Sequence, residues 1–558
     1  MNGMHSTSEP LPDGLPCHRL VLGAMLTGIG VAALLLLTSP GLPMVWDEGN
    51  AIRRAEGIAR WAGRWTDAGE KAHQPGPLTE EAIEQDWQYT THVEGHPALY
   101  GIVIASGRAI SARWLGPLSS ARFGPMMLFG LAAGVMFYRM AREYSIVAAI
   151  AAVISLVLLP RVFAHAHFAS YDGPLTSCWI LMWATFAPAR EGRRWAVLWG
   201  IALGMTLSAK ATGWIAPLPF LIWAAVYRDR AAARALVLGM PVALLTFFVL
   251  NPPLWHHPIQ GPVTFFQMNL SRAARPELNI ATQFLGRMYD LHHPLPWYNT
   301  LVWTAVTVPV GILVFAGVGL IAVCRCREDK AGMLLAANWL VLLMVRAIPG
   351  TPPHDGVRLF LPSFVFLAAL AGVGSARLID WSTTTWNRRL PAMLGVILLY
   401  LGSASSLGWY APQWLSYYSL LIGGLPGATA RGMEPTYYWD GLDRSVLDWL
   451  HHNTGPDEKV LFGAGPSENL ALLQRWGTLQ CRHGPDAPGR FRWYVLQRRP
   501  SGWTPADRWL IAHARPAFRK TIRSGGWGPW RLDVPIVEVY AYQQYRQATG
   551  AIRSKTDR

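Results

Sequence analysis

Two adjacent carboxylates, Asp47 and Glu48, follow the first long apolar run of the chain, Leu20 to Thr38. A charged side chain at the centre of a bilayer costs roughly 2.5–3.5 kcal/mol on insertion scales, so a carboxylate pair at the mouth of a membrane span is a candidate functional site. On these residues alone, a simple exit of the chain from the membrane explains the pair equally well. A carboxylate in this place can remove a proton from a hydroxyl group.

Other polar residues also stand where apolar runs end. They are His96, Asp172, Lys210, His354, Asp355 and Arg358. Lys210 is one of only six lysines in the chain, and it separates two adjacent apolar runs. An ammonium group buried there would need an anion, which makes Lys210 a candidate anion-binding residue. Snorkelling of its long side chain to the interface is the alternative.

Several histidines could bind a metal ion. His165 and His167 have a strand-like spacing with Asp172 near them, and His256 and His257 lie on another loop. Imidazole and carboxylate groups are acceptable ligands for zinc, although histidines at a membrane interface also serve as hydrogen-bonded caps. No cofactor is firmly predicted, and a divalent metal ion is left open.

The composition indicates a membrane protein. Of 558 residues, 51% are hydrophobic and 15% are charged, against about 25% charged in soluble domains. The 27 tryptophans suit the two membrane interfaces. The net charge of +15 would suggest nucleic acid only if basic residues clustered on one soluble face, and many of them instead lie in short loops between apolar runs. The five cysteines form no disulfide framework.

The apolar runs predict a mostly α-helical, polytopic protein of about eleven transmembrane helices. The basic clusters in the loops between them all lie on one side if residues 97–111 do not cross the membrane. The positive-inside rule makes that side cytoplasmic and places the C-terminus outside. The predicted spans lie near 20–38, 123–141, 145–160, 173–188, 195–209, 212–227, 235–251, 299–323, 331–345, 359–376 and 391–408.

Two shorter segments are predicted to be juxtamembrane helices in the first exterior loop. Residues 52–65 place apolar side chains at the helical period with charges on the opposite face, which is typical of a helix lying on a membrane. Residues 97–111 are too short to span, since about 20 apolar residues are needed. The first apolar run is long and further spans follow it, so it is predicted to be a retained helix rather than a cleaved signal.

The tail differs from the rest of the chain. Predicted helices at 444–453, 467–476 and 504–514 alternate with predicted strands at 459–463, 491–496 and 530–540. This alternation indicates a small α/β domain on the exterior side, without a catalytic signature. We therefore predict two domains, a transmembrane domain over residues 1–408 and an exterior domain over 409–558.

The candidate residues occur in an ordered set of short motifs, which resembles the C-type glycosyltransferases. The resemblance is to the superfamily of protein O-mannosyltransferases and lipid A aminoarabinose transferases, and it covers roughly residues 20–408. Two features depart from the family pattern: Ala98 stands where a second proline is common, and His96 stands where some members have lysine. The motifs are Trp46-Asp47-Glu48, His96-Pro97-Ala98-Leu99-Tyr100, residues 169–176 (ASYDGPLT), residues 209–213 (AKATG) and residues 354–362 (HDGVRLFLP).

The resemblance implies a polyprenyl-phosphate sugar as the donor and a hydroxyl of a protein, lipid or glycan as the acceptor, with inversion at the anomeric carbon. We assign Asp47 as the catalytic base and Glu48 as its positioning neighbour. The leaving phosphate needs positive charge, for which Lys210, Arg358 and His96 are the candidates. Asp172 would orient a substrate. His354 and Asp355 complete the predicted substrate-binding residues.

Two other functions remain open. A transporter or flippase of a lipid-linked glycan would need charges at mid-membrane and broken helices in paired positions. A ligase or oligosaccharyltransferase that moves a preassembled glycan would use the same scaffold. The preference for arginine over lysine indicates a bacterial cytoplasmic membrane and an undecaprenyl carrier, with the active site on the exterior side.

Overall fold

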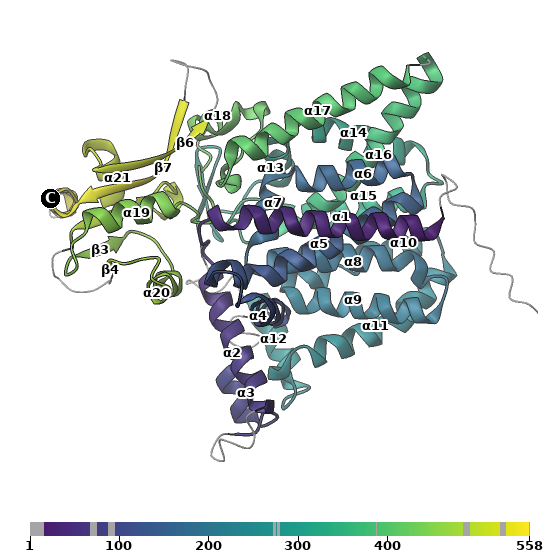
Figure 1. The fold of residues 1–558 in the computed structure, drawn as a ribbon, viewed down its shortest axis with the longest axis horizontal. Coiled ribbons are helices and arrows are strands. Elements are labelled where there is room, and N and C mark those ends of the chain that lie inside the picture. The colour runs from purple at the N-terminus through teal and green to yellow at the C-terminus, as the bar shows by residue number, and fades with distance from the viewer. Residues whose placement is uncertain are drawn as a thin grey trace, which may run out of the picture.

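The computed structural model describes residues 16–66, 75–87, 95–271, 275, 279–386, 388–483, 491–524 and 532–556. Most helices run side by side in one bundle, and a small sheet stands at one end of it (Figure 1). The candidate residues Asp47, Asp172, Lys210 and Arg358 belong to the segments that meet at this end.

Among the described residues, six helical segments are long and apolar enough to cross a membrane. A seventh forms if the pair α6 (Ile146–Val157) and α7 (Pro160–His167), bent by 73°, is one span. The chain is therefore an integral, multi-pass membrane protein. The six segments contain the helices α1 (Cys17–Thr38), α5 (Pro117–Glu143), α11 (Arg230–Val249), α15 (Lys330–Ala347), α16 (Leu361–Trp386) and α17 (Arg389–Tyr410).

The remaining predicted spans are shorter or more polar helices. Every one of the eleven predicted segments is built from helix, but length and apolar composition mark only six or seven as able to cross, so the number eleven stays a prediction. One predicted span is interrupted where Pro309 lacks the amide hydrogen that a continuous helix requires. The helices that fill these remaining predicted spans are α8 (Asp172–Ala189), α9 (Arg193–Ala209), the 3-10 turn η2 (Ala211–Ile215) with α10 (Leu218–Val226), and α13 (Asn299–Thr307) with α14 (Val310–Arg325).

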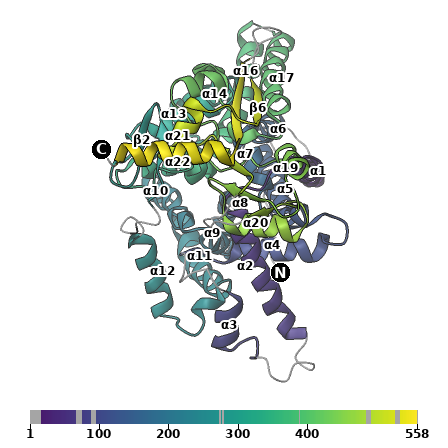
Figure 2. The same ribbon diagram turned by 90° about the vertical axis from the view of Figure 1, so that its left-hand side faces the viewer.

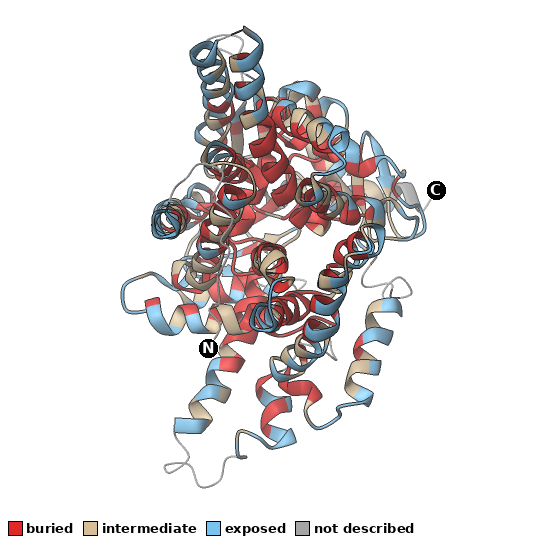
Figure 3. Cartoon of the chain, turned by 90° about the vertical axis from the view of Figure 1, so that its right-hand side faces the viewer, coloured by how far each residue is buried: buried red, intermediate tan, exposed pale blue. Residues whose placement is uncertain are grey.

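Burial separates central from peripheral helices. Of the most apolar part of each helix, 89% is buried in α16, against 28% in α1 and 11% in α17. Figure 3, seen from the end opposite the sheet, shows buried residues concentrated on the inner helices. Large side chains such as Leu398 and Leu401 of α17 are exposed. An apolar outer surface is what contact with lipid requires.

Small residues bring the central helices together. A Cβ atom added at Gly319 of α14 would lie 1.9 Å from the carbonyl oxygen of Leu370, and one added at Gly374 of α16 would lie 1.9 Å from that of Phe315. Only glycine allows this approach of the two backbones, which is the usual basis of helix association within a membrane.

The two segments predicted to be juxtamembrane helices form the helices α2 (Glu48–Thr66) and α4 (Leu99–Ser111). In Figure 1, α2 lies across the end of the bundle rather than along it. It buries Ile52, Ala55 and Ile58 and leaves Arg53 and Arg60 exposed, as the predicted periodicity requires. The second half of the helix departs from this pattern, since Ala59, Ala62 and Trp65 are exposed. Two further helices at this end, α3 (Glu80–Asp86) and α12 (Gln260–Leu270), were not predicted.

Reporter fusions placed after Thr66 and after Arg113 should report the same side of the membrane. The intervening α4 has 13 residues and is about 20 Å long at 1.5 Å per residue, too short for a hydrocarbon core of about 30 Å. A fusion after Tyr144, beyond the 27-residue α5, is the control and should report the opposite side. Opposite signals at Thr66 and Arg113 would overturn the predicted sidedness of every later loop.

The tail forms a five-stranded mixed sheet with the order β4-β3-β5-β7-β6. All six tail elements predicted from the sequence are present, and Figure 2 shows the tail helices α19, α20 and α21 in front of the bundle. Strands β4 and β6 and the last helix were not predicted. The strands are β3 (Lys459–Phe462), β4 (Arg482–His483), β5 (Trp493–Gln497), β6 (Phe518–Ser524) and β7 (Leu532–Ala541), and the helices are α19 (Arg444–Asn453), α20 (Ser467–Arg475), α21 (Pro505–His513) and α22 (Tyr542–Thr556).

The tail packs directly against the first loop of the membrane part. The side-chain amide of Asn469 donates to the carbonyl of Val45 at 2.8 Å and accepts from the amide of Gly49 at 2.9 Å. The amide of Trp46 donates to the carbonyl of Tyr438 at 3.2 Å. These bonds hold the turn that carries Asp47. The predicted boundary at residue 409 stays a prediction.

Candidate active site

Six of the eight predicted site residues line one cavity of about 730 Å³ at the end of the bundle that carries the sheet. They are Asp47, His96, Lys210, His354, Asp355 and Arg358. The sequence separates these residues by up to some three hundred positions, so only the packing of the bundle brings them together. Another part of the wall is apolar and includes Trp214, Ile215, Phe266, Leu342 and Val345.

Arg358 is the centre of a buried ion-pair network. Its Nε donates to Oδ2 of Asp172 at 2.7 Å, its Nη1 donates to Oδ2 of Asp355 at 2.6 Å, and its Nη2 donates to Oδ2 of Asp47. The Arg358 side chain is 9% exposed and that of Asp47 14%. Because a buried charge is costly unless it is paired and hydrogen-bonded, the three carboxylates hold the guanidinium in one orientation.

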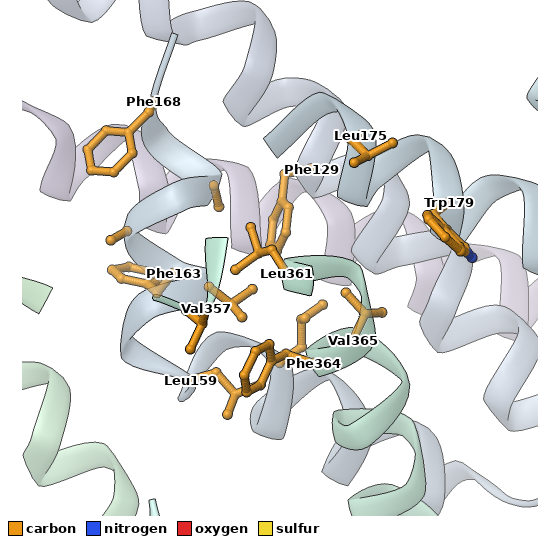
Figure 4. Packing of buried hydrophobic residues seen from close by; sticks show 14 of the residues in the cluster. Phe129, Leu159, Phe163, Phe168, Leu175, Trp179, Val357, Leu361, Phe364 and Val365 are labelled. Carbon is orange, nitrogen blue, oxygen red and sulfur yellow. The ribbon is translucent and has the colours of Figure 1, made fainter. Parts of the chain in front are cut away.

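Apolar packing fixes the backbone on both sides of Arg358. Figure 4 shows Val357 and Leu361 among buried side chains that include Phe163 and Phe129. The guanidinium is therefore attached to a short 3-10 turn, Arg358–Phe360, whose neighbours lie in the core. This packing restricts the movement of the Arg358 guanidinium relative to the other groups of the site.

Lys210 forms its ion pair with Asp172. Its Nζ donates to Oδ1 of Asp172 at 2.7 Å, and the Asp172 side chain is 1% exposed. Asp172 is the first residue of α8, where the helix dipole favours a carboxylate. Asp172 does not itself line the cavity, but it contacts both cations that do. Its geometry thus suits the orientation of Lys210 and Arg358 rather than direct contact with a substrate.

Glu48, predicted as the positioning neighbour of the catalytic base, does not line the cavity. Its two carboxylate oxygens accept from Nε and Nη2 of Arg122, both at 2.7 Å, and both side chains are fully buried. The amides of Val45 and Ala169 also donate to it. Consecutive residues at a helix start project in different directions, so Glu48 cannot share the position of Asp47. It anchors the turn before α2 instead.

Tyr438 of the tail was missed by the sequence reasoning. Its hydroxyl donates to Oδ2 of Asp47 at 2.7 Å, and the Arg358 guanidinium lies 4.4 Å from its ring centre. Burial raises the pKa of Tyr438 well above its ordinary value, against the lowering effect of Arg358. The hydroxyl therefore stays protonated and can donate. The only local signal was the aromatic run at residues 437–439.

His96 lines the cavity, and its ring stacks on Tyr171 with centroids 4.5 Å apart and planes at 19°. Tyr171 belongs to the motif at residues 169–176 and lines the same cavity. A stacked imidazole ring has a fixed orientation and offers its ring edge to a ligand. A lysine at the same place would instead offer a flexible ammonium group.

The histidines proposed as metal ligands do not come together. His165 and His167 lie on the helix α7, not on a strand, so side chains two residues apart point in different directions. His167 Nε2 lies 2.8 Å from Thr38 Oγ1. His256 and His257 instead contact Leu78 and Glu80 of the first loop. No group of three or more His, Cys, Asp or Glu side chains that could hold a metal ion occurs within the described residues.

The loop before Arg358 has an unusual backbone. Asp355 has a φ of 60° and Gly356 a φ of 59°, in the left-handed region that a non-glycine residue rarely adopts. Burial alone would raise the pKa of Asp355, but Arg499, His354 and Arg358 together hold it below its ordinary value. Asp355 is therefore ionised and pairs with both Arg358 and Arg499.

Arg346, at the end of α15, is a second residue that the sequence reasoning missed. It lines the cavity and donates to the carbonyl oxygens of Pro352 and Pro353. Within the described residues it forms no ion pair with a carboxylate. Its positive charge therefore adds to those of Lys210 and Arg358 in the cavity wall. Its hydrogen bonds to Pro352 and Pro353 hold the loop before Asp355.

The solved structures to which the chain is similar are distant in sequence. ArnT from Cupriavidus metallidurans, bound to undecaprenyl phosphate, is 16% identical with a TM-score of 0.48, over 95% of this chain and 99% of that one. The oligosaccharyltransferase AglB from Archaeoglobus fulgidus, in complex with an inhibitory peptide and a dolichol-phosphate, is 12% identical with a TM-score of 0.46, over 85% of this chain and 61% of that one. No curated protein matches the chain.

A family comparison covers the segment that contains three of the predicted site residues. Residues 96–256, with His96, Asp172 and Lys210, match the family described as dolichyl-phosphate-mannose-protein mannosyltransferase. The remaining motifs, around Asp47 and Arg358, lie outside the matched segment but meet it in the same cavity. The chain is therefore similar to the dolichyl-phosphate-mannose-protein mannosyltransferase family over residues 96–256.

Proposed function

We propose that the protein transfers a sugar from a polyprenyl-phosphate donor to an acceptor hydroxyl, with inversion, on the exterior face of a bacterial cytoplasmic membrane. The observation that carries the proposal is the two-sided cavity, which has an apolar wall around Trp214 and Phe266 and a charged wall around Arg358. A lipid-linked sugar needs both kinds of surface in one space. The family name, which refers to a dolichyl-phosphate sugar, supports the same class of donor.

In the proposed reaction, Asp47 removes the proton of the acceptor hydroxyl. The acceptor oxygen forms a bond to the anomeric carbon from one face while the bond to the phosphate oxygen breaks on the other. The phosphate leaves with the electron pair, and the sugar passes through an oxocarbenium-like transition state. Attack opposite to the leaving group inverts the anomeric carbon. Tyr438 and Arg358 orient the Asp47 carboxylate through their hydrogen bonds.

Lys210 and Arg358 would stabilise the negative charge that develops on the phosphate. In the structure both cations are paired with carboxylates. A donor phosphate that binds Arg358 competes with Asp47 for the guanidinium. Binding of the donor would thereby weaken the ion pair between Asp47 and Arg358 and leave the Asp47 carboxylate free to contact the acceptor hydroxyl.

Replacing Lys210 or Arg358 by Ala should raise the apparent KM for the donor by about tenfold or more, since tenfold corresponds to only 1.4 kcal/mol of lost binding. The measurement is release of polyprenyl phosphate from a polyprenyl-phosphate monosaccharide by the purified protein. Lys330→Ala is the control, because Lys330 begins α15 and lines a separate cavity. A change in the KM for the acceptor alone would contradict the assignment.

The same assay separates the alternatives. A transporter or flippase would leave the sugar–phosphate bond intact and release no polyprenyl phosphate. A ligase or oligosaccharyltransferase would turn over only a donor that carries a preassembled glycan. The clustering of Asp47, Lys210 and Arg358 at one end of the bundle, rather than at mid-membrane, favours transfer over transport.

A further inference from the structure

One arginine of the tail reaches the ion-pair network of the cavity. Arg499 follows strand β5, its side chain is 2% exposed, and its Nη2 donates to Oδ1 of Asp355 at 3.2 Å. The guanidinium lies 4.9 Å from the ring centre of Trp439. Its Nε is 3.8 Å from Oε2 of Glu434, which is also buried. Arg499 is thus held by the tail on one side and presents its charge to the membrane part on the other.

Asp355 is shared between two guanidinium groups. Its Oδ1 accepts from Arg499 of the tail, while its Oδ2 accepts from Nη1 of Arg358 at 2.6 Å. Without Arg499, both oxygens of Asp355 would be available to Arg358. A carboxylate and a guanidinium then prefer a two-point, side-on pair. Such a pair would turn Arg358 away from Asp47 and Asp172.

We propose that Arg499 is a positioning residue for the transfer reaction: by occupying one oxygen of Asp355 it keeps Arg358 directed toward Asp47, Asp172 and the donor phosphate. The C-terminal region then completes the active site rather than standing beside it. Tyr438, from the same region, contacts Asp47 directly and agrees with this role. The proposal rests on the proposed function, in which Arg358 binds the donor.

The backbone of Asp355 supports the same conclusion. A non-glycine residue in the left-handed region persists only where its surroundings over-determine it. Asp355 meets this condition through Arg358 on its own side and Arg499 across the interface. Arg499 is also the largest of the effects that lower the pKa of Asp355 against the effect of burial.

The test uses the full-length protein in detergent and three variants. Arg499→Met removes the charge and keeps the apolar stem, and it should raise the KM for a polyprenyl-phosphate monosaccharide by about tenfold, a typical coupling between residues in contact. The KM for the acceptor should not change. Arg499→Lys, which keeps the charge, should restore part of the donor affinity. Arg498→Met is the matched control, since the adjacent Arg498 pairs with Glu538 inside the sheet at 2.9 Å.

A double-mutant cycle between Arg499→Met and Asp355→Asn completes the experiment. If Arg499 acts through Asp355, the double variant should have a donor KM no higher than the worse single variant. Additive effects, or a lower unfolding temperature with an unchanged donor KM, would overturn the proposal.

The unfolding temperatures of the four proteins of this cycle are also measured without donor. These proteins are the unmodified protein, Arg499→Met, Asp355→Asn and the double variant, and their unfolding temperatures do not depend on the proposed function. If the unmodified protein releases no polyprenyl phosphate, the proposed function fails. Coupling of the two substitutions in the unfolding temperature still supports the link between Arg499 and Asp355, and its absence overturns that link.

Discussion

Replacement of Asp47 by Asn is expected to lower the rate of sugar transfer by about 10²–10⁴-fold, the usual contribution of a general base. The Asn side chain has the same shape, and its carbonyl oxygen can still accept the hydrogen bond from Tyr438. It cannot take the proton of the acceptor hydroxyl. The protein should therefore fold and bind the donor at least as tightly as the unmodified protein, because Arg358 loses a competing carboxylate, while the chemical step becomes slow.

The measurement compares transfer rate and donor affinity for this variant and for Glu56→Gln in the same detergent. Glu56 is the matched control because it lies on the same helix α2 and pairs with Arg108 and Arg475, outside the cavity wall. Near-normal transfer by a folded Asp47→Asn protein would exclude Asp47 as the base.

The second large effect concerns stability. Replacing Arg122 by Met should lower the free energy of unfolding by about 3–5 kcal/mol, the usual cost of breaking a buried ion pair by removing one partner. The loss arises because Glu48 would remain buried and charged without its guanidinium. The free carboxylate would also disturb the amides of Val45 and Ala169 that it accepts from, and thus the turn before Asp47.

Chemical unfolding in detergent and the yield of folded protein measure this effect. The double variant Arg122→Met/Glu48→Gln removes both charges and should recover a large part of the lost stability. Glu48→Gln alone should reduce turnover less than Asp47→Asn, since Glu48 does not line the cavity. If Arg122→Met is as stable as the unmodified protein, the Glu48–Arg122 pair does not anchor the turn.

Local patterns in the sequence predicted much of the fold. The apolar runs predicted the segments that are helical, and the periodicity of residues 52–65 predicted the helix α2. The six tail elements were also placed correctly, because alternation and helical spacing are properties of short stretches. The motif residues Asp47, Lys210 and Arg358 were recognisable because charged side chains are rare beside apolar runs.

The remaining features depend on contacts between distant segments. Asp47 lines the cavity, whereas Glu48 pairs with Arg122. No pattern in the sequence around Arg122 indicated this partner. Helix α7 separated the two histidines that a strand-like spacing had placed together. The contributions of Tyr438 and Arg499 arise only when the sheet packs on the end of the bundle. Because a hydrogen bond requires a specific distance and angle between its two groups, the tertiary structure alone decided which charges of this chain meet.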